Sequence, residues 1–398
     1  MTLEPQNPWT PELLNPLSRL RVCIVTDAFL PGVGGIENHV LHLSAGLQRL
    51  GHEVLVVSHE VPANAPVVGS QVESAVPVVR LPGRLLLIKD HDIAIDPGMI
   101  QAFRRLLRER QFDIVHGQSE GSFLVFGALA AARRLGLPTI LTRHSMLGMK
   151  PALLRPLLKG LVRLLLGYAD GVIAVSEACA REIRLGPKKL KVIPNGVDIG
   201  QFRPESDARE RVRAELGFAA DDVVIGNVGR LHVSKGVLML LDVFEQLRAQ
   251  NPKLKLLLGG PGPLHRQIAE RTAPYAGQVR LLGAMAFDRV PAVLNALDIF
   301  ALPSFGEAFG ISLLEAMACG VPGVALDRWG VKDLVRSGET GFLVATQEEF
   351  RERLARLASD AGLRRKLGNA ARTRAETFSW ERVTKETVAF YRELTAKG

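Results

Sequence analysis

The chain has 398 residues, 47% of them hydrophobic, a length and composition typical of two or three domains with large buried cores. Its formal net charge is +9, but basic residues are not interleaved with aromatic ones, so the charge favours an anionic ligand or a membrane surface over nucleic acid. No run reaches the roughly 18 uncharged apolar residues of a membrane-spanning helix, and none is predicted.

Residues 1–18 are polar and rich in proline, and they lack the basic and then apolar pattern of a secretory signal. We therefore expect a tail there. The three cysteines, Cys23, Cys179 and Cys319, are far apart and have no metal-type spacing. This usage is typical of reduced core residues, and it predicts a cytoplasmic protein.

From residue 19 onward, short apolar runs alternate with amphipathic stretches. Residues 20–27 are predicted to form a buried strand, which a glycine loop and a helical stretch follow. The strand-like runs that continue this rhythm are HEVLVVSH, FDIVHGQ, PTILTRH and GVIAVS. Strands separated by helices are typical of parallel sheets built from βαβ units. We predict a Rossmann-like N-terminal domain over residues 19–200 that binds the second substrate.

The same pattern starts again after residues 191–204, which are rich in proline, glycine and asparagine and are predicted to form a hinge. Residues 201–376 are predicted to form a second Rossmann-like domain, and the last helix, over 377–398, could cross back to the first. The predicted fold class is α/β, with two facing, doubly wound domains. Because parallel sheets bind ligands at the carboxyl ends of their strands, we expect the ligand in a cleft between the domains.

Gly34 and Gly35 lie between the first strand and its helix. Glycine there lets the backbone approach an anion, and the helix offers free N–H groups. The dinucleotide fingerprint G-x-G-x-x-G fails because Glu37 stands at the third glycine position, which disfavours an oxidoreductase. A tight turn that binds nothing is the alternative.

Arg230 and Lys235 follow a glycine turn near the start of another predicted helix. Two cations beside helix N–H groups form a clamp for phosphate. The loop is not a Walker A motif, because Lys235 precedes Gly236 instead of following it. Two solvated cations are the alternative.

Glu307 and Glu315 are eight residues apart, the first in a loop after a predicted strand and the second inside a helix. On one helix they would be roughly 12 Å apart, farther than the roughly 5–9.5 Å of a glycosidase pair. The amides of Phe309 and Gly310 lie between them. Carboxylates bind hydroxyls and helix amides bind phosphate, so the order favours a nucleotide diphosphate sugar, with Glu315 on the ribose and Glu307 on the sugar. Two unrelated glutamates are the alternative.

Together these motifs resemble the retaining glycosyltransferases of family 4, which have the GT-B fold. The resemblance covers about Arg21 to Val344 and rests on GGIE, GRL…SKG, GGPGPL, VIPNGVD and the two glutamates after LPS. The segments GGIENHV and TRHSMLG are most similar to the catalytic subunit that adds GlcNAc to phosphatidylinositol in GPI-anchor synthesis, and to its bacterial relatives.

The resemblance implies transfer of a sugar from a nucleotide sugar, with UDP as the expected nucleotide, to an acceptor hydroxyl on a lipid or small molecule, with retention and without a metal or another cofactor. It places His144 near the reacting carbon. His116, at the end of another predicted strand, is expected to support the site. The residues that it assigns to donor binding are Gly34, Gly35, Arg230, Lys235, Phe309, Gly310 and Glu315. Those that it assigns to catalysis are His144, Glu307, Arg230 and Lys235.

Two positions depart from the family pattern. The usual G-G-x-P-E loop is replaced by RWGVKDLV, which contains Trp329, Lys332 and Asp333, and Arg143 replaces the acid that usually precedes the histidine. These departures leave the sugar and the acceptor open.

A D-x-D pair, Asp90 and Asp92, is the metal signature of another glycosyltransferase fold, but it lies outside the single-domain context that the motif requires. Cations and helix amides already supply the charge stabilisation, so we expect no metal.

Lys150, Arg155, Lys159 and Arg163 are spaced five, four and four residues apart among leucines. This pattern suits a helix lying on anionic lipid at the inner face of the membrane. Pro156 interrupts the helix, so a core helix with a basic edge is the alternative.

Two other functions remain open. A nucleotide-sugar epimerase of the same fold would need no acceptor. A hinged sugar- or nucleotide-binding protein without catalysis would bind the ligand and release no diphosphate.

Overall fold

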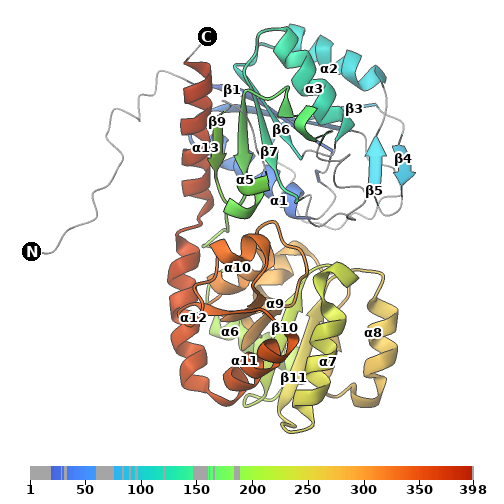
Figure 1. Cartoon of the computed structure of the whole chain (residues 1–398), viewed down its shortest axis with the longest axis vertical. Helices are drawn as coiled ribbons and strands as arrows, with labels where there is room; N and C mark the ends of the chain where they lie inside the picture. The colour runs from blue at the N-terminus through green and yellow to red at the C-terminus, as the bar shows by residue number, and fades with distance from the viewer. Residues whose placement is uncertain are drawn as a thin grey trace, which may run out of the picture.

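The computed structural model describes residues 19–27, 29–30, 34–59, 76–82, 85–88, 91–94, 97–119, 122–146, 160, 162–164, 166–182 and 189–396. Two α/β domains lie one above the other, and two C-terminal helices run along one side of both (Figure 1). Each domain is built around one parallel sheet.

The sheet of the N-terminal domain has seven parallel strands in the order β3-β2-β1-β6-β7-β8-β9. The chain builds it outward from β1 and then from β6, so the order reverses between these two strands. The strands are β1 (Arg21–Thr26), β2 (Glu53–His59), β3 (Val78–Leu81), β6 (Ile114–Gln118), β7 (Thr139–Arg143), β8 (Gly171–Ala174) and β9 (Lys189–Val192). The helices around it are α1 (Gly35–Arg49), α2 (Pro97–Glu109), α3 (Phe123–Arg134) and α5 (Glu177–Glu182).

An antiparallel hairpin, β4 (Leu85–Ile88) and β5 (His91–Ala94), lies beside this sheet. The sequence did not predict it. Asp92 of the D-x-D pair is in β5, and Asp90 lies outside the described residues. Asp92 therefore belongs to a strand of the antiparallel pair.

The sheet of the C-terminal domain has six parallel strands in the order β12-β11-β10-β13-β14-β15 and reverses between β10 and β13. Its strands are β10 (Val223–Val228), β11 (Leu254–Gly259), β12 (Val279–Leu281), β13 (Ile299–Leu302), β14 (Gly323–Leu326) and β15 (Gly341–Val344). Its α-helices are α6 (Ser206–Glu215), α7 (Val237–Arg248), α8 (His265–Thr272), α9 (Val290–Asn295), α10 (Ile311–Ala318), α11 (Gln347–Ser359) and α12 (Ala361–Glu376). Short 3-10 turns are η5 (Val233–Lys235), η6 (Ala273–Tyr275), η7 (Phe287–Arg289) and η8 (Trp329–Asp333).

The central strands of both sheets are buried along their length because helices cover both faces. All six residues of β10 are buried, and so are all four of β13. The predicted fold class, an α/β chain with two doubly wound parallel sheets, is confirmed.

The last helix, α13 (Trp380–Thr395), begins where the side chain of Ser379 accepts a hydrogen bond from the Arg382 amide. Such a cap starts a new helix after the break that follows α12. While α12 packs against α10, α13 packs against α1 in the N-terminal domain (Figure 1). Its buried side chains Trp380, Phe390 and Tyr391 join the core around β1 and β2. The chain therefore returns at its end to the first domain.

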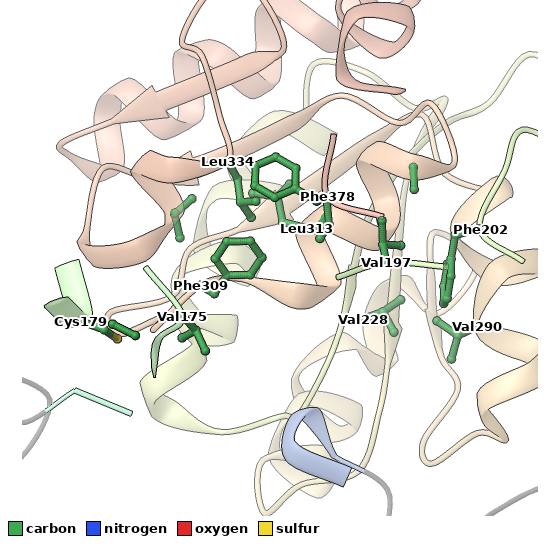
Figure 2. Close-up of a cluster of buried hydrophobic side chains, with 14 of the residues drawn as sticks. Val175, Cys179, Val197, Phe202, Val228, Val290, Phe309, Leu313, Leu334 and Phe378 are labelled. Atoms are coloured by element: carbon green, nitrogen blue, oxygen red, sulfur yellow. The ribbon is translucent and has the colours of Figure 1, made fainter. Parts of the chain in front are cut away.

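A buried apolar cluster continues across the boundary between the domains (Figure 2). Val175 and Cys179 contribute to it from the N-terminal domain, and Phe309 and Leu313 contribute from the C-terminal domain. The ring of Phe309 packs edge-on against Phe378, with 5.8 Å between the ring centroids. The two domains thus pack directly on one another.

Candidate active site

The points at which the two sheets reverse their strand order lie against each other. The N-terminus of α1, which follows β1, meets that of α10, which follows β13. A Cβ built on Gly35 would be 3.2 Å from the Cδ1 atom of Ile311. Ligands of doubly wound sheets bind at these reversal points, beyond the carboxyl ends of the strands. The boundary between α1 and α10 is therefore the candidate site.

Gly34 caps α1, and a side chain there would collide with Glu37. A Cβ on Gly34 would be only 2.5 Å from the Oε2 atom of Glu37. Burial raises the pKa of Glu37, while its own backbone amide and the charge of Arg230 in the other domain lower it. In the sequence, Glu37 served only to exclude a dinucleotide site. Glu37 lies in the first turn of α1, where an acid can reach back to the helix N-terminus, and this position could have indicated that Glu37 belongs to the candidate site.

Lys235 and Glu307 come together from two loops of the C-terminal domain. The Lys235 Nζ atom lies 2.6 Å from the Glu307 Oε1 atom, and both side chains are largely buried. The Phe305 amide also donates to the Ser234 carbonyl at 3.0 Å. The predicted phosphate lysine and the predicted sugar glutamate thus form one ion pair. Arg230, five residues before Lys235 in the sequence, is exposed.

Gly236 allows this approach. Its φ of 66° is in the left-handed region, and a Cβ would lie 2.0 Å from the Pro303 carbonyl oxygen. Any other residue would push the Lys235 loop away from the end of β13.

Phe309 is buried, and Gly310, with a φ of 101°, caps α10. Glu315 lies one turn into this helix and is 7% exposed. Burial raises its pKa to about 8. Burial thus favours the protonated form of Glu315 at neutral pH, whereas the sequence led us to expect a carboxylate. A neutral acid both donates and accepts hydrogen bonds, which suits a pair of ribose hydroxyls.

Glu315 should make stability depend on pH. Between about pH 4.5 and 8 the folded protein keeps a proton on Glu315 that the unfolded chain has lost, so the free energy of unfolding falls as pH rises through this window. We expect Glu315→Gln to remove this contribution. The urea midpoint of the variant, relative to that of the wild type, should therefore increase as pH rises. Parallel midpoints across the window would contradict the protonated state.

His144 follows β7 and lies beside two buried histidines, His39 and His116. Its Nε2 atom is 2.7 Å from the Gln118 Oε1 atom, and its ring centroid is 4.7 Å from that of His39 on α1. His39 in turn lies 2.8 Å from the Asn195 Oδ1 atom, through its Nδ1 atom. Burial lowers the pKa of His144 well below its usual value and that of His39 to about 4. Both rings are therefore neutral at physiological pH.

Both departures from the family pattern have structural roles. Arg143 is fully buried, and its guanidinium lies 2.7 Å from the Glu182 carboxylate, so it holds α5. Asp333 accepts a hydrogen bond from the Glu177 amide, at the start of α5, across the domain boundary at 2.7 Å. The Trp329 indole donates to the Phe305 carbonyl at 3.1 Å. The RWGVKDLV segment thus links the Lys235–Glu307 region to the N-terminal domain.

Several predicted features lie at or beyond the limits of the described residues. Lys150, Arg155 and Lys159 fall outside them, and the Arg163 side chain is exposed. Across the described residues, no helix is long and apolar enough to cross a bilayer. In the same ranges, no three His, Cys, Asp or Glu side chains are grouped to hold a metal ion, and a metal-free reaction stays a prediction. The three cysteines are buried and form no disulfide.

Two family models match the chain, one for each domain. Residues 33–201 match Glycosyltransferase Family 4, and residues 208–374 match Glycosyl transferases group 1. The two matches cover the elements that carry the candidate site.

Curated relatives include two kinds of transferase. In Arabidopsis thaliana, a phosphatidylinositol N-acetylglucosaminyltransferase polypeptide is 32% identical over 80% of this chain and 69% of its own length. The gpi3 polypeptide of the same transferase from Schizosaccharomyces pombe is 29% identical, over 85% and 72%. The D-inositol 3-phosphate glycosyltransferase of Actinosynnema mirum is 29% identical, over 90% and 92%.

Solved structures share the fold. Sucrose-phosphate synthase from Thermosynechococcus elongatus superposes with a TM-score of 0.78 at 24% identity, over 96% of this chain and 100% of that one. Anabaena HepE, in complex with UDP and glucose, gives a TM-score of 0.76 at 19% identity, over 94% and 100%.

Proposed function

Because the chain belongs to glycosyltransferase family 4 and has the GT-B fold, we propose that it moves a sugar from a UDP-linked donor to an acceptor hydroxyl with retention of configuration. It is a glycosyltransferase, and the family implies a nucleotide-sugar donor and an acceptor. The observation that carries the proposal is the Lys235–Glu307 pair beside the N-terminus of α10, where the strand order reverses.

In the proposed complex the donor diphosphate lies between the N-termini of α1 and α10. Arg230 and Lys235 neutralise it, and the amides at Phe309 and Gly310 bind its oxygens. Glu307 exchanges its contact with Lys235 for the donor sugar, and Glu315 binds the ribose diol. The cations and amides stabilise the charge that grows on the leaving diphosphate.

The proposed reaction proceeds on one face of the sugar. The bond from the anomeric carbon to the diphosphate oxygen breaks as the bond to the acceptor oxygen forms. The acceptor proton passes to the departing diphosphate.

The donor nucleotide is tested by thermal unfolding with UDP, GDP, ADP and NAD in parallel. A ligand at about 100 times its dissociation constant stabilises the folded state by about 2.7 kcal/mol, which raises the Tm by several degrees. We expect the rise with UDP alone. A rise with GDP or ADP would change the donor, and a rise with NAD alone or with no nucleotide would refute the assignment.

We propose an inositol-bearing acceptor and a GlcNAc donor, because the relatives named above act on inositol compounds and two of them transfer N-acetylglucosamine by name. UDP release from UDP-GlcNAc is measured with phosphatidylinositol vesicles, with inositol phosphate and with neither. Release that needs vesicles supports a lipid acceptor and membrane binding through the predicted basic segment that ends at Arg163. Conversion of the donor sugar without an acceptor would instead support the epimerase, and binding without release would support the non-catalytic protein.

A further inference from the structure

A chain of buried polar side chains connects His144 to the C-terminal helix. The Gln118 carboxamide touches two histidines: its Oε1 atom is 2.7 Å from His144 Nε2, and its Nε2 atom is 3.2 Å from His116 Nε2. His116 continues the chain through its Nδ1 atom, 2.6 Å from the Tyr391 hydroxyl on α13. The Thr142 hydroxyl lies 2.6 Å from His116 Nε2. All of these side chains except His144 are fully enclosed.

With its oxygen toward His144 and its amino group toward His116, the Gln118 carboxamide implies a position for each ring proton. A buried carboxamide must use both its donating and its accepting end. In this orientation the Gln118 amino group would donate to His116 Nε2, whose lone pair also faces the Thr142 hydroxyl. The His116 proton would then be on Nδ1, facing the Tyr391 oxygen. The Gln118 oxygen accepts from His144, which places the His144 proton on Nε2. The Nδ1 atom of His144 is then a hydrogen-bond acceptor.

The surroundings also hold His144 neutral. Burial lowers its pKa first, and the neighbouring His39 on α1 and His116 on β6 lower it further. A carboxamide carries no charge that could balance an imidazolium. With a carboxylate in the same place, the cation would be favoured instead.

We propose that Gln118 is a positioning residue, which holds His144 in the tautomer protonated at Nε2 so that its Nδ1 lone pair accepts a hydrogen bond from a hydroxyl of the bound donor sugar. The assignment rests on the proposed sugar transfer, in which His144 lies beside the donor. Gln118 touches no substrate and acts through His144. Tyr391 and His116 keep the carboxamide from rotating.

The first test is ¹⁵N NMR of the histidine-labelled wild type, with the His144 signals assigned from their loss in His144→Asn. We expect the pattern of a neutral ring protonated at Nε2 at every pH between about 5.5 and 8.5. A ring protonated at Nδ1, or one that titrates in this range, would overturn the proposal. This measurement needs no turnover, so it is separate from the proposed function.

The second test compares the pH dependence of kcat in the wild type, Gln118→Glu and Thr142→Val. A carboxylate at Gln118 should raise the pKa of His144, so kcat should fall about tenfold per pH unit below it, while the wild type stays flat. Thr142→Val removes a contact of His116 but keeps the Gln118–His144 bond, so its profile should match the wild type. The same profile in Gln118→Glu and the wild type would refute the role.

The outcomes separate the two hypotheses. If the wild type transfers no sugar, the proposed function fails and the NMR result still decides the tautomer. If Gln118→Glu does not fold, Gln118→Met takes its place, for which we expect mixed His144 tautomers and a kcat at least about tenfold lower with a similar Tm. An unchanged Nε2 tautomer in Gln118→Met would show that Gln118 does not set it.

Discussion

Replacing Lys235 with alanine is expected to lower kcat by about 10²–10³, the loss typical of removing one preorganised group that stabilises charge in the transition state. In the proposed complex the variant lacks a cation at the leaving diphosphate. It also leaves the Glu307 carboxylate, whose side chain is 13% exposed, without its ion-pair partner. The lost cation and the unpaired carboxylate would both disfavour the negative charge that grows on the diphosphate in the proposed reaction. The rate of nucleoside diphosphate release at saturating donor measures the loss.

The matched control is Lys253→Ala. Lys253 also pairs with a carboxylate in the C-terminal domain, that of Asp221, but both side chains are more than half exposed. Exposed pairs contribute little, so we expect less than about a twofold change in kcat. Equal rates for the two variants would show that Lys235 is an ordinary surface cation and would remove the main support for the donor site.

Replacing Phe390 with alanine is expected to destabilise the folded chain by about 3–5 kcal/mol, the usual cost of deleting a buried aromatic ring. Phe390 is fully buried in the core of the N-terminal domain although it belongs to α13. Its ring packs where β8 begins, since a Cβ on Gly171 would be 2.8 Å from its Cζ atom. The urea midpoint of unfolding measures the change.

Lys385→Ala serves as the control on the same helix, because Lys385 is exposed and pairs only with Glu381 one turn away in the interactions described. Its free energy of unfolding should stay within about 0.5 kcal/mol of that of the wild type. If Phe390→Ala behaves like Lys385→Ala, α13 is not part of the N-terminal core in solution.

Features that depend on neighbours in sequence were predictable. The buried run of β10 and the break before α6 follow from composition, and both parallel sheets were expected from the alternation of strands and helices. The Arg230–Lys235 loop was placed correctly at the end of a strand, because glycine and strand signals are local.

Features that depend on contacts between distant parts of the chain could not be predicted from the sequence. The pairing of Lys235 with Glu307, 72 residues away, requires the close approach of Gly236 to the Pro303 carbonyl, which sequence spacing does not reveal. The protonation of Glu315 depends on burial by other elements. The contact of His116 with Tyr391 spans 275 residues and exists only because α13 crosses back.

The return of α13 also sets the order in which the chain can finish folding on the ribosome. Domains usually fold as they emerge, the first one first. Here the first domain to be synthesised needs residues 380–395 to fill its core, so it closes only after the second domain, which is complete at α12, has already emerged. A chain truncated before Trp380 would contain every element of the second domain but would lack the helix that fills the core of the first.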